Sequence, residues 1–317
     1  MKKTFIYSSI VLLLAAVACN KTDSTVSDEP IRFAFGTGAT RALVENLTDL
    51  QKETLQVYDV MGATPYYIDE TVTFGDGTWN FASGRTYTWR TGTHKFFAYT
   101  DGAGTFDDNK LMVSKTLTTA NENQVDVLYS DIVSKTKQDG VSITEAVTIP
   151  MNHLFAAAGI MVKNATSGYV TVNSVSVPVI KNQGSATVDF SAATTAVTYG
   201  ETSASGSFAT GTLADEQLAS NGLADVFAQA TADKNTYWLV WPQTIPAEGL
   251  TVTIEYTVGT GDAAKKYTSE VKLPAEATEW KAGFKYLYTI SINPHDIRLD
   301  FTVTPWVSNE GTNLIVE

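Results

Sequence analysis

Residues 250–258 read LTVTIEYTV, with an apolar residue at every second position. In an extended chain, Leu250 and the four apolar residues that alternate after it share one face, and the threonines and Glu255 share the other. One face of such a strand can be buried while the other stays in water. The stretch therefore predicts a β-strand at the surface of a hydrophobic core.

The same two-residue period recurs along the chain. Residues 284–292 (FKYLYTISI) and 299–303 (LDFTV) repeat it, and turn-forming steps such as Gly75-Asp76-Gly77 separate several of the runs. Further predicted strands are residues 31–35, 54–60, 67–74, 78–82, 86–89, 95–99, 125–129, 143–149, 154–162 and 170–177. Only Leu213 to Ala230 has a helical pattern. Many short strands joined by turns predict an all-β protein built from antiparallel β-sandwiches.

The length of the chain predicts two domains. A chain of 317 residues exceeds what one ordinary hydrophobic core covers. We place the boundary in the strand through His153, which gives an N-terminal sandwich of residues 31–152 and a C-terminal sandwich of residues 153–317. Residues 182–212 are rich in Gly, Ser, Ala and Thr, and we expect weak edge strands and loops of the second domain there.

The N-terminus has the pattern of an export signal. Lys2 and Lys3 precede an apolar stretch, residues 5–18, that is too short to span a membrane and ends in small residues before Cys19, the single cysteine. This resembles a bacterial lipobox, in which Cys19 is lipidated and becomes the mature N-terminus, although Ala16 stands where leucine is preferred. We expect a signal peptide at residues 1–18 and a flexible tether at 19–30. The alternative is a plain signal peptide with a chance cysteine.

Composition argues against several classes of function. The formal net charge is −12 and the pI is about 4.7, so we expect no binding to nucleic acid. One cysteine and three widely spaced histidines offer no metal-ligand pattern. His153 has no nucleophile motif to partner it and is interpreted as structural. The sequence predicts no enzyme, no metal and no cofactor.

An ordered set of short motifs resembles the fimbrillin family of Bacteroidales lipoproteins, which are subunits and accessory proteins of surface pili. No single motif is specific, but the order extends over nearly the whole chain. After the lipobox the motifs are residues 33–35 (FAF), 40–42 (TRA), 55–58 (LQVY), 87–89 (YTW), 96–99 (FFAY), 125–129 (VDVLY), 151–154 (MNHL), 241–243 (WPQ), 280–283 (WKAG), 286–290 (YLYTI) and 302–306 (TVTPW).

The resemblance implies two transthyretin-like β-sandwiches and a surface pilus assembled by strand exchange. In such a subunit an arginine-specific surface protease removes the first strand, here with Ile31, Phe33 and Phe35 on one face. Arg41, followed by Ala42, is the one arginine between the first two predicted strands, so we expect cleavage there. The implied partners are other pilus subunits, and the implied location is the outer membrane and the fimbrium. The alternative is that Arg41 is only a loop charge and the strand stays in place.

The C-terminal segment is a candidate donor strand. Leu314 and Val316 share one face of residues 312–316, which follow a turn at Gly311, and residues near Leu299 to Val303 are possible additional anchors. The alternative is that residues 312–316 close their own sandwich.

A second function class is a surface glycan-binding lipoprotein. Sugars stack on exposed aromatic rings, and Tyr66, Tyr67 and Trp79 are the candidates because they lie beside Pro65 or a glycine turn. Most of the six tryptophans fall in or beside apolar runs, which favours a role in the core.

Overall fold

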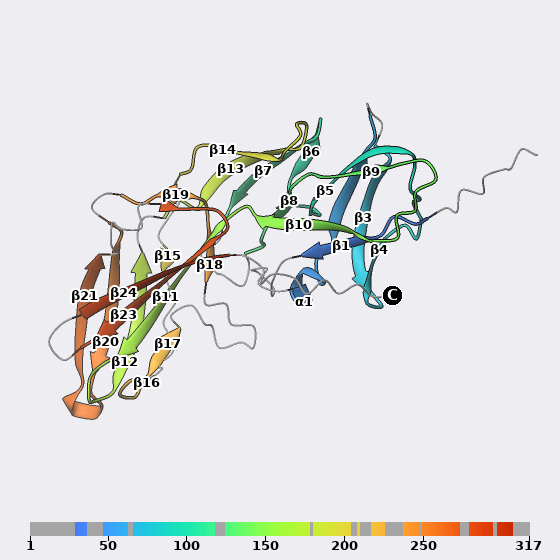
Figure 1. Ribbon diagram of the computed structural model, residues 1–317. Helices are drawn as coiled ribbons and strands as arrows, with labels where there is room; N and C mark the ends of the chain where they lie inside the picture. The colour runs from blue at the N-terminus through green and yellow to red at the C-terminus, as the bar shows by residue number, and fades with distance from the viewer. Residues whose placement is uncertain are drawn as a thin grey trace, which may run out of the picture.

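The computed structural model confirms the all-β prediction (Figure 1). It describes residues 29–36, 47–62, 66–117, 124–177, 180–203, 208–209, 217–225, 237–246, 249–272, 279–293 and 297–306. Within these residues nearly all regular structure is strand, apart from the short helix α1 (Leu47–Leu50) and a 3-10 turn at Gly261–Ala263. Several sheets pack face to face, as expected of a sandwich fold, while the number of domains stays a prediction.

The N-terminal half forms an eight-stranded sheet. Its strand order is β1-β10-β8-β5-β2-β3-β4, and β9 pairs with β5 beside that path. The bounds are β1 (Phe33–Gly36), β2 (Leu55–Val60), β3 (Ile68–Gly75), β4 (Thr78–Phe81), β5 (Gly92–Thr100), β8 (Leu128–Ser130), β9 (Val133–Lys137) and β10 (Val147–His153). Side chains of β1 and β4, at the two ends of this order, contact each other, so the sheet curls around its own core.

A four-stranded sheet packs on the outer face of this curled sheet and lies between it and the rest of the molecule in Figure 1. Its order is β14-β13-β7-β6, with bounds β6 (Thr105–Asp107), β7 (Lys110–Thr116), β13 (Gln183–Asp189) and β14 (Ala196–Tyr199). Strand β13 is an inner strand that pairs with β7, a strand of the first 152 residues. The expectation that residues 182–212 form only edge strands and loops of the second half is therefore wrong for β13.

Two five-stranded sheets enclose the core of the C-terminal half. One contains β11 (Ala156–Asn164), β17 (Leu223–Asp225), β18 (Trp238–Val240), β23 (Phe284–Ile292) and β24 (Ile297–Pro305). The other contains β12 (Val170–Val177), β15 (Phe208–Ala209), β16 (Gln217–Leu218), β20 (Thr251–Val258) and β21 (Lys265–Lys272). Strands β19 (Gln243–Thr244) and β22 (Glu279–Trp280) form a separate pair. Among the described strands, two pairs are parallel, β1 with β10 and β11 with β23.

The expected helix at Leu213 to Ala230 is wrong where the structure describes it, because strands β16 and β17 lie there. The turn between them contains Asn221 with a positive φ of 61°. The buried amide of Asn164 donates hydrogen bonds to the carbonyls of Leu218 and Ala219. These tertiary hydrogen bonds hold a turn where the local pattern favours a helix.

Changing Gly184 to Ala should lower the free energy of unfolding by about 1–3 kcal/mol, because the new methyl group has no space. Gly184 lies in β13, and a Cβ built there would meet Cδ2 of Trp241 at 2.8 Å. Trp241 is fully buried, so its ring has little room to move. Chemical denaturation of the two chains measures the difference.

The matched control is Gly168→Ala, where a Cβ meets nothing within 4 Å. We expect no comparable loss from that change. Equal stability of the Gly184→Ala and unaltered chains would contradict the close packing of β13 on Trp241.

Candidate strand-exchange site

Residues 29–36 lie between two backbone segments of the N-terminal half. On one side β1 pairs in parallel with β10, from Phe33 opposite Val147 to Gly36 opposite Pro150. On the other side residues 29–31 run antiparallel to residues 87–89, through a bridge between Pro30 and Thr88. The Ile31 N–H donates to the Tyr87 carbonyl at 2.8 Å, and the Trp89 N–H donates to the Glu29 carbonyl at 3.0 Å. The segment thus joins two edges that would otherwise be open.

Three apolar side chains of this segment fill the core of the curled sheet, as the sequence predicts for one face. Ile31, Phe33 and Phe35 are 4%, 6% and 4% exposed. The Phe33 ring meets the rings of Phe81 and Phe96 edge to face, and the Phe35 ring meets Trp79 with 4.8 Å between centroids. Burial of each large side chain contributes about 1.5–3 kcal/mol.

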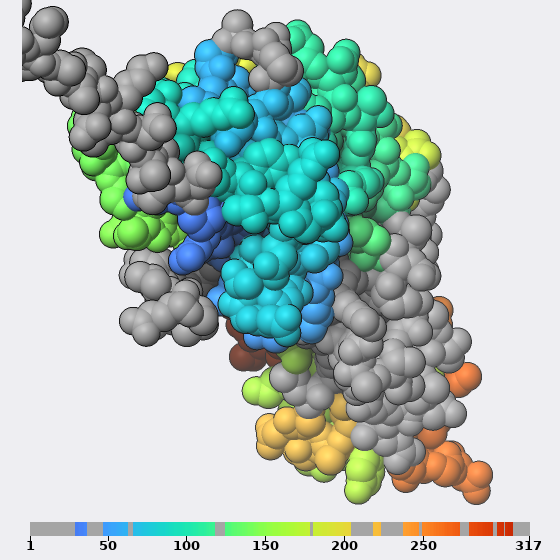
Figure 2. Space-filling model, turned by 90° about the vertical axis from the view of Figure 1, so that its right-hand side faces the viewer, coloured from blue at the N-terminus to red at the C-terminus, as the bar shows by residue number. Residues whose placement is uncertain are grey.

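The outer edge of the segment reaches the surface. Figure 2 shows its dark blue atoms beside cyan atoms of residues that follow β3 in the chain. Arg32 is exposed and Ala34 is half-buried, so the face opposite the three anchors borders solvent. A strand at this position has a buried side and an accessible side.

Glu29 anchors the start of the segment, and sequence analysis missed it. Its carboxylate accepts hydrogen bonds from the Ser142 hydroxyl, from the Ile143 N–H at 2.9 Å and from the Lys137 ammonium at 3.0 Å. These hydrogen bonds, that of Ser142 first, lower the pKa of Glu29 from 4.5 to about 2. The carboxylate therefore stabilises the fold above pH 4.5, and this contribution is lost as the pH falls toward 2.

Residues 87–89, which pair with residues 29–31, pack against a buried histidine, His94. Both ring nitrogens of His94 face acceptors: Nδ1 lies 2.5 Å from the Asp59 carboxylate and Nε2 lies 2.8 Å from the Arg90 carbonyl. Burial opposes the charged imidazole, but these hydrogen bonds raise the pKa of His94. The Trp89 ring packs on His94 with 4.9 Å between centroids, so residues 87–89 have a fixed backing.

The other sequence-predicted site residues lie outside the described residues. These are Cys19, Arg41, Ala42, Leu314 and Val316. Of the expected tether at residues 19–30 only Glu29 and Pro30 are described, and both are held by the contacts above. The predicted strand at 86–89 is an extended segment with one bridge, at Thr88.

His153 has the structural role that the sequence predicts. It is buried, its Nδ1 lies 2.8 Å from the Asp126 carboxylate, and its ring stacks on Trp306 with 3.7 Å between centroids. Trp306 follows β24, so this contact ties the end of the described chain to β10. No nucleophilic side chain takes part in these contacts among the residues that the structure describes.

The aromatic residues proposed for sugar binding pack against other side chains and are not fully exposed to solvent. Tyr66 stacks edge to face on Tyr58, Tyr67 packs on Tyr87 and lies under the Arg90 guanidinium, and Trp79 contacts Phe35. All three are half-buried. They form no common exposed platform for a sugar ring.

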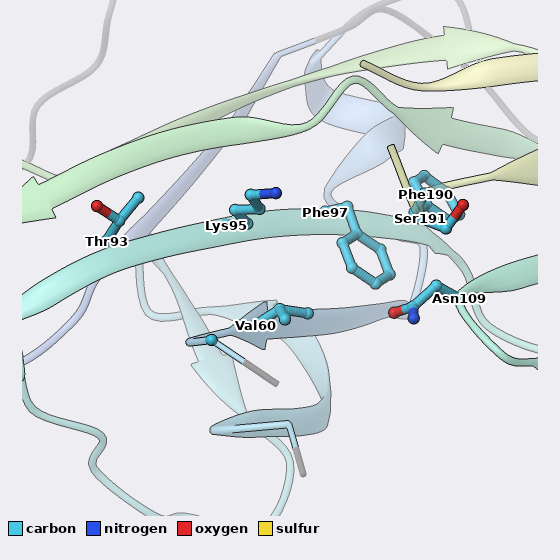
Figure 3. A pocket seen from close by; sticks show the side chains of 8 residues that line it. Val60, Thr93, Lys95, Phe97, Asn109, Phe190 and Ser191 are labelled. Atoms are coloured by element: carbon cyan, nitrogen blue, oxygen red, sulfur yellow. The ribbon is translucent and has the colours of Figure 1, made fainter. Parts of the chain in front are cut away.

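A cleft of about 470 Å³ lies beside β5 and is shown in Figure 3. It is lined by Val60, Gly62, Thr93, Lys95, Phe97, Asn109, Phe190 and Ser191. The rings of Phe97 and Phe190 stack on each other at 4.4 Å and are 1% and 4% exposed. The cleft therefore offers little aromatic surface for a sugar.

Metal ligands and membrane-spanning helices can be assessed for the part of the chain that the structure describes. No group of three or more His, Cys, Asp or Glu side chains there could hold a metal ion. No helix there has the length and apolar character needed to cross a membrane.

The described residues form an all-β protein in which residues 29–36 pair with β10 on one side and with residues 87–89 on the other. The sequence profile of the fimbrillin-like family matches residues 40–306, and the protein belongs to that family. The matched range begins after β1 and just before Arg41. A search of the curated proteins gives no match.

Solved structures of two Bacteroides proteins have a similar fold. A candidate cell adhesion protein from Bacteroides uniformis is 20% identical with a TM-score of 0.52, and the alignment covers 88% of this chain and 100% of that one. A fimbrial protein from Bacteroides vulgatus is 15% identical with a TM-score of 0.56, and the alignment covers 88% and 99%. At these identities the likeness shows the shared fold alone. Family membership itself supports a fimbrial subunit at the cell surface, assembled with other pilus subunits.

Proposed function

We propose that the protein is a fimbrial subunit that joins its neighbours by strand exchange and supports adhesion without any chemistry of its own. An arginine-specific protease at the cell surface cuts after Arg41, the segment with β1 leaves, and a strand of another subunit takes its place. The observation that carries this proposal is the position of residues 29–36 between β10 and residues 87–89. A single strand at this position pairs with both backbone edges and fills the core with its apolar side chains.

The physical argument is that an empty groove is unstable. Loss of residues 29–36 exposes the pockets of Ile31, Phe33 and Phe35 and leaves residues 147–150 of β10 without their partner strand. Open strand edges bind other strands, and alternate apolar pockets select the side chains that fill them. The vacated groove therefore favours a donor strand with apolar residues at every second position.

Anchoring at Cys19 belongs to the same proposal. Lipidation there would hold the exported chain at the outer membrane until processing. Cleavage at Arg41 would separate the lipid and β1 from the remainder, because both precede the cut. One proteolytic event would then release the subunit and open its groove.

The change Arg41→Gln tests the proposal. Without the arginine the protease has no cut site between β1 and β2, so we expect full-length protein in the membrane fraction and no fibres. Mass spectrometry of the chain and electron microscopy of the cell surface provide the two readouts. Thermal unfolding of the purified variant should match that of the unaltered precursor.

The matched control is Arg85→Gln. Arg85 follows the turn after β4, its side chain is 72% exposed, and its guanidinium pairs with Glu70 at 3.5 Å. Cells with this variant should carry normal fibres. Normal fibres from the Arg41→Gln variant would instead show that removal of β1 at this site is unnecessary.

A further inference from the structure

A carboxylate-binding site lies at the mouth of the groove that β1 fills. It is formed by the Lys137 ammonium, the Ser142 hydroxyl and the Ile143 N–H, and Glu29 occupies it. Lys137 is 8% exposed, and its ammonium also donates to the Val141 carbonyl. Glu29 supplies the one carboxylate that pairs with Lys137 among the described residues.

Departure of residues 29–36 would leave this site with a cation and no counter-charge. A buried ammonium without an anion is unfavourable, and so are the unpaired Ser142 and Ile143 donors. A donor strand that brings a carboxylate to this point satisfies all three groups. A strand that brings an amide or an apolar side chain leaves the charge of Lys137 unpaired.

We propose that Lys137, Ser142 and Ile143 form an acid-reading site that sets the register of the donor strand. This inference rests on the strand exchange proposed above and adds the identity of the strand that fits. The segment that leaves has an acid at Glu29 followed by apolar anchors at Ile31, Phe33 and Phe35. A donor strand that replaces this segment with the same chain direction needs a carboxylate two positions before the first side chain that enters the core.

The C-terminal segment of a second copy of this chain meets that requirement. Glu310 is followed at the same spacing by Thr312, Leu314 and Val316. Seating Glu310 in the site of Glu29 places Leu314 in the pocket of Phe33 and Val316 in that of Phe35. The opposite face of the same segment presents Gly311, Asn313 and Ile315, with no acid at the first position. The acid-reading site thus selects one face and one register.

The experiment uses the full chain with Cys19→Ala, cut at Arg41 with an arginine-specific protease. A fluorescent synthetic peptide of residues 307–317 is added, and anisotropy gives its affinity and dissociation rate. We expect the peptide with Glu310→Gln to bind about tenfold or more weakly, mainly through faster dissociation. A peptide with Glu317→Gln loses the same charge outside the register and should bind like the unaltered one.

A change in the groove completes the test. In Lys137→Gln protein the two peptides should bind alike, because the group that reads the acid is gone. Lys135→Gln is the matched control, since Lys135 lies on the same strand but is exposed, and it should keep the difference. The peptide comparison stands alone if the Lys137 variant does not fold.

The outcomes separate the two proposals. Tight binding of both peptides with equal affinity overturns the acid-reading site and leaves strand exchange intact. Binding of neither peptide shows that this segment is not the donor, and both the exchange by residues 312–316 and the inference fail. A loss confined to Glu310→Gln, and dependent on Lys137, supports both.

Discussion

A disulfide between β1 and β10 should keep the processed protein monomeric. Ala34 and Thr148 are register partners on the two strands, Ala34 is half-buried and Thr148 is exposed, so a cysteine pair there leaves the core untouched. Cα atoms of paired strands lie within the range that a disulfide spans. In a chain with Cys19→Ala, Ala34→Cys and Thr148→Cys, the bridge holds β1 in its groove even after cleavage at Arg41. We expect no fibres under oxidising conditions and normal fibres after reduction.

The control for this variant carries the same kind of bridge elsewhere. Thr253 and Glu270 oppose each other on β20 and β21, with Thr253 half-buried and Glu270 exposed. A cysteine pair at those positions should polymerise equally well when oxidised and when reduced. Light scattering after addition of protease follows both variants. Fibres that form at the normal rate with β1 locked would exclude displacement of that strand.

Removal of residues 312–317 should abolish fibres while leaving a folded monomer. β24 and the buried Trp306 are the last described parts of the chain, and both precede the deletion. The deletion removes Leu314 and Val316, the two large anchors of the proposed donor strand, each of which contributes about 1.5–3 kcal/mol when it is seated. Size-exclusion chromatography after cleavage at Arg41 should then give monomer alone.

Point changes on the two faces of the same segment refine this result. Leu314→Asn with Val316→Asn should block assembly as the deletion does, whereas Ile315→Asn lies on the opposite face and should permit it. Normal fibres from the truncated chain would refute the donor role. An unfolded truncated monomer would show that residues 312–317 belong to the chain's own sandwich.

The two-residue period of apolar residues predicts strands accurately where the local sequence determines the structure. Residues 170–177 and 284–292 match β12 and β23 at both ends, and residues 250–258 match β20 to within one residue. The inward face of residues 31–35 was also predicted, because alternation assigns Ile31, Phe33 and Phe35 to one side. Trp238 and Trp241 are buried in the core, as the apolar Leu239 and Val240 between them indicate.

The pairing of strands that are far apart in the chain could not be predicted, because it leaves no pattern in the local sequence. Nothing in residues 183–189 indicates that they pair with β7, and nothing in β1 indicates a parallel partner. The role of Glu29 was missed for a similar reason. Its three donors lie more than a hundred positions away at Lys137, Ser142 and Ile143, and a Glu next to a Pro reads as part of a polar tether.

The N-terminal sequence of the subunit in purified surface fibres tests the central claim most directly. If β1 is removed before assembly, Edman degradation of fibre protein should begin at Ala42, and the mass should lack Cys19, its lipid and residues 29–36. Fibre protein that still begins at a lipidated Cys19 would contradict the account, because its groove would remain filled by its own first strand.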